Sequence, residues 1–142
     1  MSRTLMLLLL CALLCSAPLA LAESSTAELN ADALIARQAT GDASLLVLDV
    51  RSAANFAAGH VPGSINVPYA TLEGQLAALP QLKDHDLVVY CTTGKLAALA
   101  LELLSSHGYT RLQHLSGDME GWRAAARPIE QSSPVEATVA PR

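Results

Sequence analysis

The sequence predicts one α/β domain with a central, mostly parallel sheet of about five strands and helices on both faces. Two short apolar runs, residues 45–48 and 87–90, consist almost wholly of Leu and Val, as expected of strands buried on both faces. Segments with helical character separate the apolar runs, and this alternation favours parallel pairing through right-handed crossovers. The length of 142 residues fits one domain with one core.

The first elements are an extended lead-in, a helix and a buried strand. Residues 23–29 are extended, and Asn30 is a good N-cap for a helix over residues 31–38, which Gly41 closes. The run at residues 45–48 ends at an aspartate and gives the first buried strand.

The middle of the chain holds short elements. A helix over residues 53–58 leads into residues 59–63, where Pro-Gly chemistry indicates a turn. A short strand over residues 64–67 follows. A helix over residues 71–79 then has leucines on one face and ends before a proline.

The last elements surround the second buried strand, residues 87–90. The strongest helical pattern of the chain follows at residues 95–107 and is closed by Gly108. A strand over residues 111–115 and a helix over residues 118–126 complete the domain.

Residues 1–22 have the three parts of a cleavable signal peptide. Arg3 supplies the positive charge, residues 5–14 are an apolar run, and Ala20-Leu21-Ala22 is a cleavage pattern. An uncleaved membrane anchor is the alternative, but the apolar run is short for a spanning helix. We therefore expect export to the bacterial periplasm, a mature chain that starts near Glu23, and no membrane attachment after cleavage.

The remaining regions bound the domain and its partners. Residues 128–142 are rich in Pro, Ser and Glu without apolar periodicity, so we expect a disordered tail after a domain over residues 23–127. The formal charge is −4, and a mildly acidic chain without a basic block is a poor candidate for binding nucleic acid. The histidines lack metal-ligand spacing, so we expect no metal. We also expect no other cofactor and a monomer.

Cys91 stands where the second buried strand ends and the helix at residue 95 begins. Free backbone N–H groups and the helix dipole favour an anion there, and the thiolate is the nucleophilic form of cysteine. Cleavage after residue 22 would remove Cys11 and Cys15, leaving one cysteine and no internal disulfide. A buried, inert cysteine is the alternative, but the position before Gly94 and a helix favours a reactive thiol.

Several motifs together carry a resemblance to a known family: residues 48–51 (Leu-Asp-Val-Arg), 59–68 (Gly-His-Val-Pro-Gly-Ser-Ile-Asn-Val-Pro), 90–94 (Tyr-Cys-Thr-Thr-Gly), 108–109 and 117–122. In this order and spacing they resemble a single-domain rhodanese, a sulfurtransferase whose cysteine accepts a sulfur atom as a persulfide. The resemblance covers residues 29–127. It implies a rhodanese-like fold, a donor such as thiosulfate, and cyanide or a thiol as acceptor.

The resemblance implies that Cys91 is the nucleophile and that the loop after it binds the substrate through Thr92, Thr93, Gly94, Lys95 and Leu96. Backbone N–H groups of this loop can converge on the outer sulfur. Rhodanese loops commonly read Cys-x-x-Gly-x-Arg, but Leu96 replaces the arginine here and the cation is Lys95. A lysine lacks the bidentate fork of arginine, so we expect weaker thiosulfate binding, another donor or an impaired domain. Lys95 as an ordinary solvated lysine stays open.

Three further residues are expected to support the site. Asp49 and Arg51 follow a buried strand, and ligands bind beyond the carboxyl ends of such strands. We expect a structural network between them at the pocket wall, with a direct substrate role for Arg51 as the alternative. His60 is expected to anchor its turn, since nothing pairs it in sequence with Cys91 as a base.

Three functions stay open. The first is an exported thiosulfate sulfurtransferase that acts through a Cys91 persulfide. The second, motivated by Leu96, is a sulfur carrier or anion-binding module with little turnover. The third, a thiol redox protein, lacks a second cysteine to resolve a disulfide. Related phosphatases use a Cys-x5-Arg loop, and Ala97 at the arginine position disfavours phosphate-ester hydrolysis.

Overall fold

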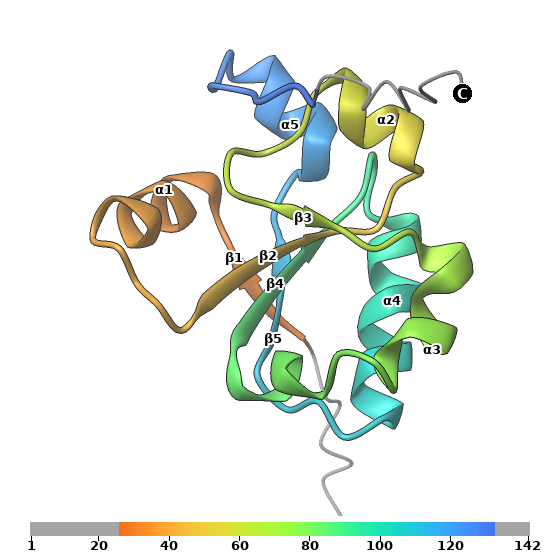
Figure 1. The fold of residues 1–142 in the computed structure, drawn as a ribbon. Helices are drawn as coiled ribbons and strands as arrows, with labels where there is room; N and C mark the ends of the chain where they lie inside the picture. Colours follow the sequence, from red (N-terminus) through yellow and green to blue (C-terminus); the bar gives the residue numbers. More distant parts are fainter. Residues whose placement is uncertain (1–25, 133–142) are drawn as a thin grey trace, which may run out of the picture.

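The fold is a five-stranded parallel sheet in the order β1-β5-β4-β2-β3 (Figure 1). The computed structural model describes residues 26–132. The strands are β1 (Ala27–Leu29), β2 (Leu45–Asp49), β3 (Ile65–Asn66), β4 (Asp86–Tyr90) and β5 (Leu112–Leu115). Every strand pair is parallel, which confirms the predicted sheet. The central strand β4 ends directly before Cys91, so the cysteine lies at the middle of the sheet's carboxyl edge.

Helices cover both faces of the sheet, also as predicted. They are α1 (Ala31–Ala39), α2 (Ala53–Ala58), α3 (Tyr69–Leu76), α4 (Lys95–Ser106) and α5 (Asp118–Ala124). In Figure 1, α3 and α4 lie on one side of the sheet and α1 on the other. The core is accordingly divided in two. Leu72 of α3 and Leu104 of α4 pack with Val89 of β4, whereas Leu34 of α1 and Trp122 of α5 pack with Val88.

Local sequence explains where the helices begin. The Asn30 side chain accepts a hydrogen bond from the Ala33 N–H at 2.8 Å, which confirms the predicted N-cap of α1. Ser52 caps α2 in the same way, accepting from the Asn55 N–H at 3.2 Å. The third helix begins at Tyr69 rather than Thr71, because the Thr71 hydroxyl donates to the Pro68 carbonyl instead of capping the helix.

Other boundaries also differ from the sequence prediction, and α3 ends at Leu76 rather than at residue 79. Residues after α3 form a 3-10 helix, Pro80–Asp84, where the sequence suggested only the end of a helix. Helix α5 ends at Ala124 rather than Ala126, because Ala126 adopts a left-handed conformation with φ of 51°. These differences lie at element ends, where local backbone hydrogen bonds, such as that from the Leu82 N–H to the Leu79 carbonyl, decide the conformation.

Residues 128–132, which the sequence assigns to a disordered tail, make specific contacts. The Trp122 indole N–H donates to the Pro128 carbonyl at 2.7 Å. Glu130 and His60 exchange two backbone hydrogen bonds of 2.9 and 3.0 Å as an isolated antiparallel bridge. The segment is ordered because it satisfies polar groups of a distant turn, a contact that composition does not reveal. Residues 133–142 lie outside the described residues.

The predicted signal peptide, its cleavage site and the mature start at Glu23 also lie outside the described residues. Within residues 26–132, none of the helices has the length and apolar character that a membrane span requires.

Candidate active site

Cys91 is held at the carboxyl end of β4 by contacts with the start of α5. Its carbonyl accepts a hydrogen bond from the Met119 N–H at 3.0 Å, and the Thr92 carbonyl accepts from the Glu120 N–H at 3.2 Å. Only 2 % of the Cys91 surface is exposed, and the residue packs in the core cluster that includes α4. The backbone that carries the sulfur is therefore held by hydrogen bonds to the start of α5 and by packing in the core.

The loop after Cys91 directs one backbone donor at the sulfur. The Gly94 N–H donates to Cys91 Sγ with an N···S distance of 3.0 Å. Gly94 has a φ of 98°, and a Cβ atom there would lie 2.9 Å from Asp118 Oδ2. The position thus requires glycine for both its conformation and its close contact. Helix α4 begins at the next residue, so its N-terminus also favours negative charge near the sulfur.

The side chains of the loop face solvent. Thr92, Thr93 and Lys95 are exposed, and Leu96 is 40 % exposed. Ala97, at the arginine position of the phosphatase loop, is fully buried. The loop therefore presents an exposed lysine and an exposed leucine beside the backbone N–H of Gly94.

Asp49 and Arg51 form the network that the sequence suggested. Asp49 is fully buried and Arg51 is 5 % exposed. Arg51 Nε lies 3.0 Å from Asp49 Oδ1, and an Arg51 terminal nitrogen donates to Asp49 Oδ2 at 2.6 Å and to the Gly59 carbonyl at 2.9 Å. The described hydrogen bonds of this guanidinium end on the scaffold, which favours a structural role over direct substrate binding.

His60 lies in the turn that Arg51 holds. Its Nδ1 lies 2.8 Å from the Phe56 carbonyl, and its ring stacks on Phe56 with 3.6 Å between ring centroids. Its Nε2 lies 3.6 Å from a carboxylate oxygen of Glu130. These contacts are those of a residue that anchors a turn, as expected.

Three residues beneath the cysteine loop were missed by sequence reasoning. Asp118 Oδ1 accepts the Cys91 N–H at 2.9 Å, and Asp118 Oδ2 lies 3.0 Å from His114 Nε2. His114 Nδ1 lies 2.8 Å from a Glu28 carboxylate oxygen. An aspartate after Gly117 at a helix start was visible in the sequence as a possible ligand of backbone N–H groups. The position of Glu28 opposite His114 was not visible, because it depends on β1 pairing with β5.

Burial and the two carboxylates act in opposite directions on His114. Burial lowers the pKa of His114, but its hydrogen bonds with Glu28 and Asp118 outweigh that effect and raise the pKa above the ordinary value of 6.5. Burial likewise raises the pKa of Glu28, but the hydrogen bonds from Ser116 and His114 make the net change a decrease. The hydrogen bonds among Glu28, His114 and Asp118 therefore favour the charged forms of both His114 and Glu28.

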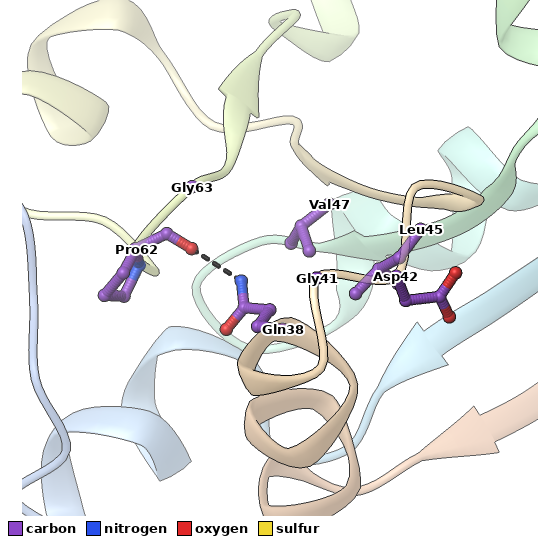
Figure 2. Close-up of a pocket in the computed structure, with 7 residues that line it drawn as sticks. All are labelled: Gln38, Gly41, Asp42, Leu45, Val47, Pro62 and Gly63. Atoms are coloured by element: carbon purple, nitrogen blue, oxygen red, sulfur yellow. Dashed lines mark hydrogen bonds between the residues drawn. The ribbon is translucent and has the colours of Figure 1, made fainter.

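Two surface clefts lie apart from the cysteine. One, of about 380 Å³, lies between the end of α1 and the turn at Pro62 and Gly63, where Gln38 donates to the Pro62 carbonyl at 2.7 Å (Figure 2). The other lies between β1, α4 and β5 and reaches Glu28 and His114. Within residues 26–132, no group of three His, Cys, Asp or Glu side chains is arranged to hold a metal ion.

Known proteins share this arrangement of elements. A thiosulfate:glutathione sulfurtransferase of Homo sapiens is 36% identical over 88 residues, which are 54% of this chain and 76% of that protein. An HTH-type transcriptional regulator of Mycobacterium tuberculosis is 35% identical over 104 residues, or 72% of this chain, and the chain spans only 44% of its length. The solved structure of a human single-domain sulfurtransferase superposes with a TM-score of 0.61 at 30% identity, over 70% of this chain and 97% of that one. The family model of the rhodanese-like domain matches residues 30–125, and the chain belongs to this family.

Proposed function

We propose that the protein is a sulfurtransferase that moves a sulfane sulfur from thiosulfate or a similar anion to cyanide or a thiol through a Cys91 persulfide. The observation that carries the proposal is the Gly94 N–H directed at Cys91 Sγ, 3.0 Å away, at the start of a twelve-residue helix. This setting stabilises a sulfur anion at the carboxyl edge of the sheet. The sulfurtransferase names of the relatives support the same reaction class.

The proposed reaction has two displacement steps. In the first, the Cys91 thiolate attacks the outer sulfur of thiosulfate, a sulfur–sulfur bond forms, and the donor's own sulfur–sulfur bond breaks to release sulfite. In the second, an acceptor thiolate or cyanide attacks the outer sulfur of the persulfide and the Cys91 thiolate leaves. No net oxidation occurs in the exchange with a thiolate, so one cysteine is enough.

Each loop residue has a defined part in this proposal. In this proposal the backbone of Thr92 and Thr93 lies beside the bound anion, and the Gly94 N–H, which donates to Cys91 Sγ, stabilises charge on sulfur. Lys95 attracts the anionic donor as a point charge from the exposed start of α4. Asp49 and Arg51 fix the neighbouring strand end, and His60 fixes the turn beside it.

The position of Leu96 favours a second candidate, a sulfur carrier or anion-binding module with little turnover. Leu96 is exposed beside the loop at the place where the resemblance leads one to expect an arginine. Without a bidentate cation, a donor anion is held by fewer charge-assisted hydrogen bonds. Sulfur loading and sulfur turnover must therefore be measured separately.

Intact mass spectrometry tests the loading step. The mature protein is incubated with thiosulfate, and we expect a gain of one sulfur atom that is absent in Cys91→Ala. Failure to load sulfur from thiosulfate, from a persulfide donor and from polysulfide would refute the sulfurtransferase reading.

Thiocyanate formation from cyanide separates the enzyme from the carrier. An enzyme forms many equivalents of thiocyanate for each Cys91, whereas a carrier that loads once and stalls gives about one equivalent. The control is Cys91→Ala, for which no thiocyanate above the uncatalysed background is expected.

We also propose export to the periplasm, with the domain acting there as a monomer. The support is the signal-peptide pattern of residues 1–22. N-terminal sequencing of the protein recovered from the cell envelope tests this, and a start well before Glu23 would contradict cleavage at that site. Size-exclusion chromatography with light scattering tests the oligomeric state.

A further inference from the structure

The Cys91 loop rests on a hydrogen-bonded chain that begins at the edge of the sheet. From the outside inward, it runs from Glu28 on β1 to His114 on β5, then to Asp118 at the start of α5, and ends at the Cys91 N–H. The three heavy-atom distances are 2.8, 3.0 and 2.9 Å. The chain therefore links a solvent-exposed carboxylate to the backbone of the residue that carries the sulfur.

The geometry favours the protonated form of the histidine. Both ring nitrogens of His114 face carboxylate oxygens, and an ionised carboxylate only accepts hydrogen bonds. Only the protonated ring has an N–H group at each nitrogen, so the two contacts together favour the imidazolium form. The arrangement then holds two negative charges and one positive charge.

Asp118 depends on this cation. Only 3 % of Asp118 is exposed, and its two described hydrogen bonds use one oxygen for the Cys91 N–H and the other for His114. Asp118 also has a left-handed backbone with a φ of 52°, which an aspartate tolerates better than most residues do. A buried carboxylate without a counter-ion is costly, so the charge of His114 stabilises the carboxylate that holds the cysteine backbone.

The other groups near His114 do not replace that charge. Its neighbours in the sheet are Glu28 on β1 and Val89 on β4. From α4, Glu102 lines the same cleft as His114, and Lys95 at the helix start is exposed. Gly94 approaches the ring closely, since a Cβ atom there would lie 3.6 Å from His114 Nε2.

We propose that Glu28, His114 and Asp118 are positioning residues for Cys91, and that protonated His114 offsets the negative charge of Asp118 so that the sulfur can carry its own. This inference deepens the proposed function and rests on it for the reaction, but not for the reactivity of the thiol. When His114 loses its proton, the summed charge of Glu28, His114 and Asp118 changes from −1 to −2. The added negative potential opposes both the thiolate and the approach of an anionic donor.

The first test uses the unsubstituted protein. NMR titration of the His114 ring gives the pH at which it loses its proton, and iodoacetamide alkylation gives the rate constant of Cys91 at each pH. Because loss of the His114 proton makes the thiolate less favourable, we expect the observed alkylation rate to rise less steeply with pH, over the interval in which His114 titrates, than a single thiol titration would give. A rate that follows a single thiol titration through that interval overturns the proposal.

A double-mutant cycle provides the second test. His114→Gln keeps an amide donor but removes the charge. We expect roughly five- to tenfold slower alkylation of Cys91 near pH 7, because a correspondingly smaller fraction of the thiol is ionised. Adding Asp118→Asn retains an oxygen for the Cys91 N–H and removes the uncompensated charge, so it should restore most of the rate. If the two substitutions only damaged the structure, their losses of alkylation rate would add in the double variant. Additive losses would therefore contradict the proposal.

His107→Gln is the matched control. His107 lies at the end of α4, where its Nδ1 is 2.9 Å from the Leu103 carbonyl, and it is exposed. We expect its alkylation profile to match that of the unsubstituted protein. Because alkylation needs no sulfur donor, a protein that alkylates as expected but never loads sulfur refutes the proposed function alone. A protein that loads sulfur without any influence of His114 refutes this inference alone.

Discussion

The single residue on which the cysteine loop most depends is Gly94. Its left-handed φ of 98° and its N–H contact with Cys91 Sγ are parts of one conformation. A left-handed non-glycine residue costs of order 1–3 kcal/mol, and here a side chain would also press on Asp118. Gly94 therefore both directs its N–H at the sulfur and adopts the left-handed conformation that the loop requires.

Gly94→Ala should damage the site more than the fold. We expect loss of most sulfur loading and a decrease of about 1–3 kcal/mol in the free energy of unfolding, measured by intact mass and urea denaturation. Gly74→Ala is the matched control, because Gly74 lies in α3 with open space around its would-be Cβ. That variant should load sulfur normally and be slightly stabilised. Equal loading by the two variants would contradict the role of Gly94.

Leu96→Arg should lower the KM for thiosulfate if the missing bidentate cation limits donor binding. An arginine at this exposed position of α4 can form two parallel hydrogen bonds to the anion. Leu99→Arg adds the same charge one turn further along the helix, at a residue that is also exposed. A specific effect appears in Leu96→Arg alone. Equal improvement in both variants would indicate general electrostatic attraction, and no change would mean that Lys95 and the backbone suffice.

At the scale of elements, the sequence was most informative where burial and local chemistry agree. The strands β2 and β4 are continuous apolar runs, and Asn30 and Ser52 cap their helices as predicted. The 3-10 helix Pro80–Asp84 was missed because such short helices have no periodic pattern of apolar residues that a sequence could reveal. The adjacency of Asp49 and Arg51 was predictable because the two residues lie on one short strand end.

The buried ion pair of Asp49 and Arg51 should contribute strongly to the stability of the protein. Arg51→Met leaves a fully buried carboxylate without its partner, and we expect a loss of about 3–5 kcal/mol in the free energy of unfolding. The double variant with Asp49→Asn should regain part of the loss. Arg37→Met is the control, because Arg37 pairs with Asp42 and Asp86 in a partly exposed network, and about 1 kcal/mol is expected there. Equal losses in urea denaturation would contradict this difference.

At the scale of the whole molecule, the cysteine motif indicates a candidate site, but distant segments supply the contacts that hold the cysteine loop. Cys91, its loop and the strand–helix junction were recognisable because they are contiguous. Glu28 was not recognisable, because it reaches His114 only through a pairing of strands 86 residues apart. The order of residues 128–132 was missed for the same reason, since their partners lie near His60.

The pH dependence of global stability should report the charge of His114. A pKa raised by Glu28 and Asp118, against the opposing effect of burial, means that the stability His114 contributes is fully present below its unfolded value of 6.5. That contribution is lost as the pH rises through the folded pKa. We expect the free energy of unfolding in urea to decrease as the pH rises above about 6.5. The decrease should be absent in His114→Gln and present in His107→Gln. An equal slope in all three proteins would contradict the linkage.

The pairing of β1 with β5 also means that the contacts beneath the cysteine loop need almost the whole described domain. These are the first and last strands within residues 26–132, and their contact joins Glu28 to a histidine 86 residues away. Closing the loop between residues so far apart costs entropy that other contacts must offset. Cys91 is synthesised well before Asp118, which holds its backbone. A nascent chain that has not yet reached α5 therefore carries its cysteine without the supporting contacts, and the thiol acquires them only when the domain is complete.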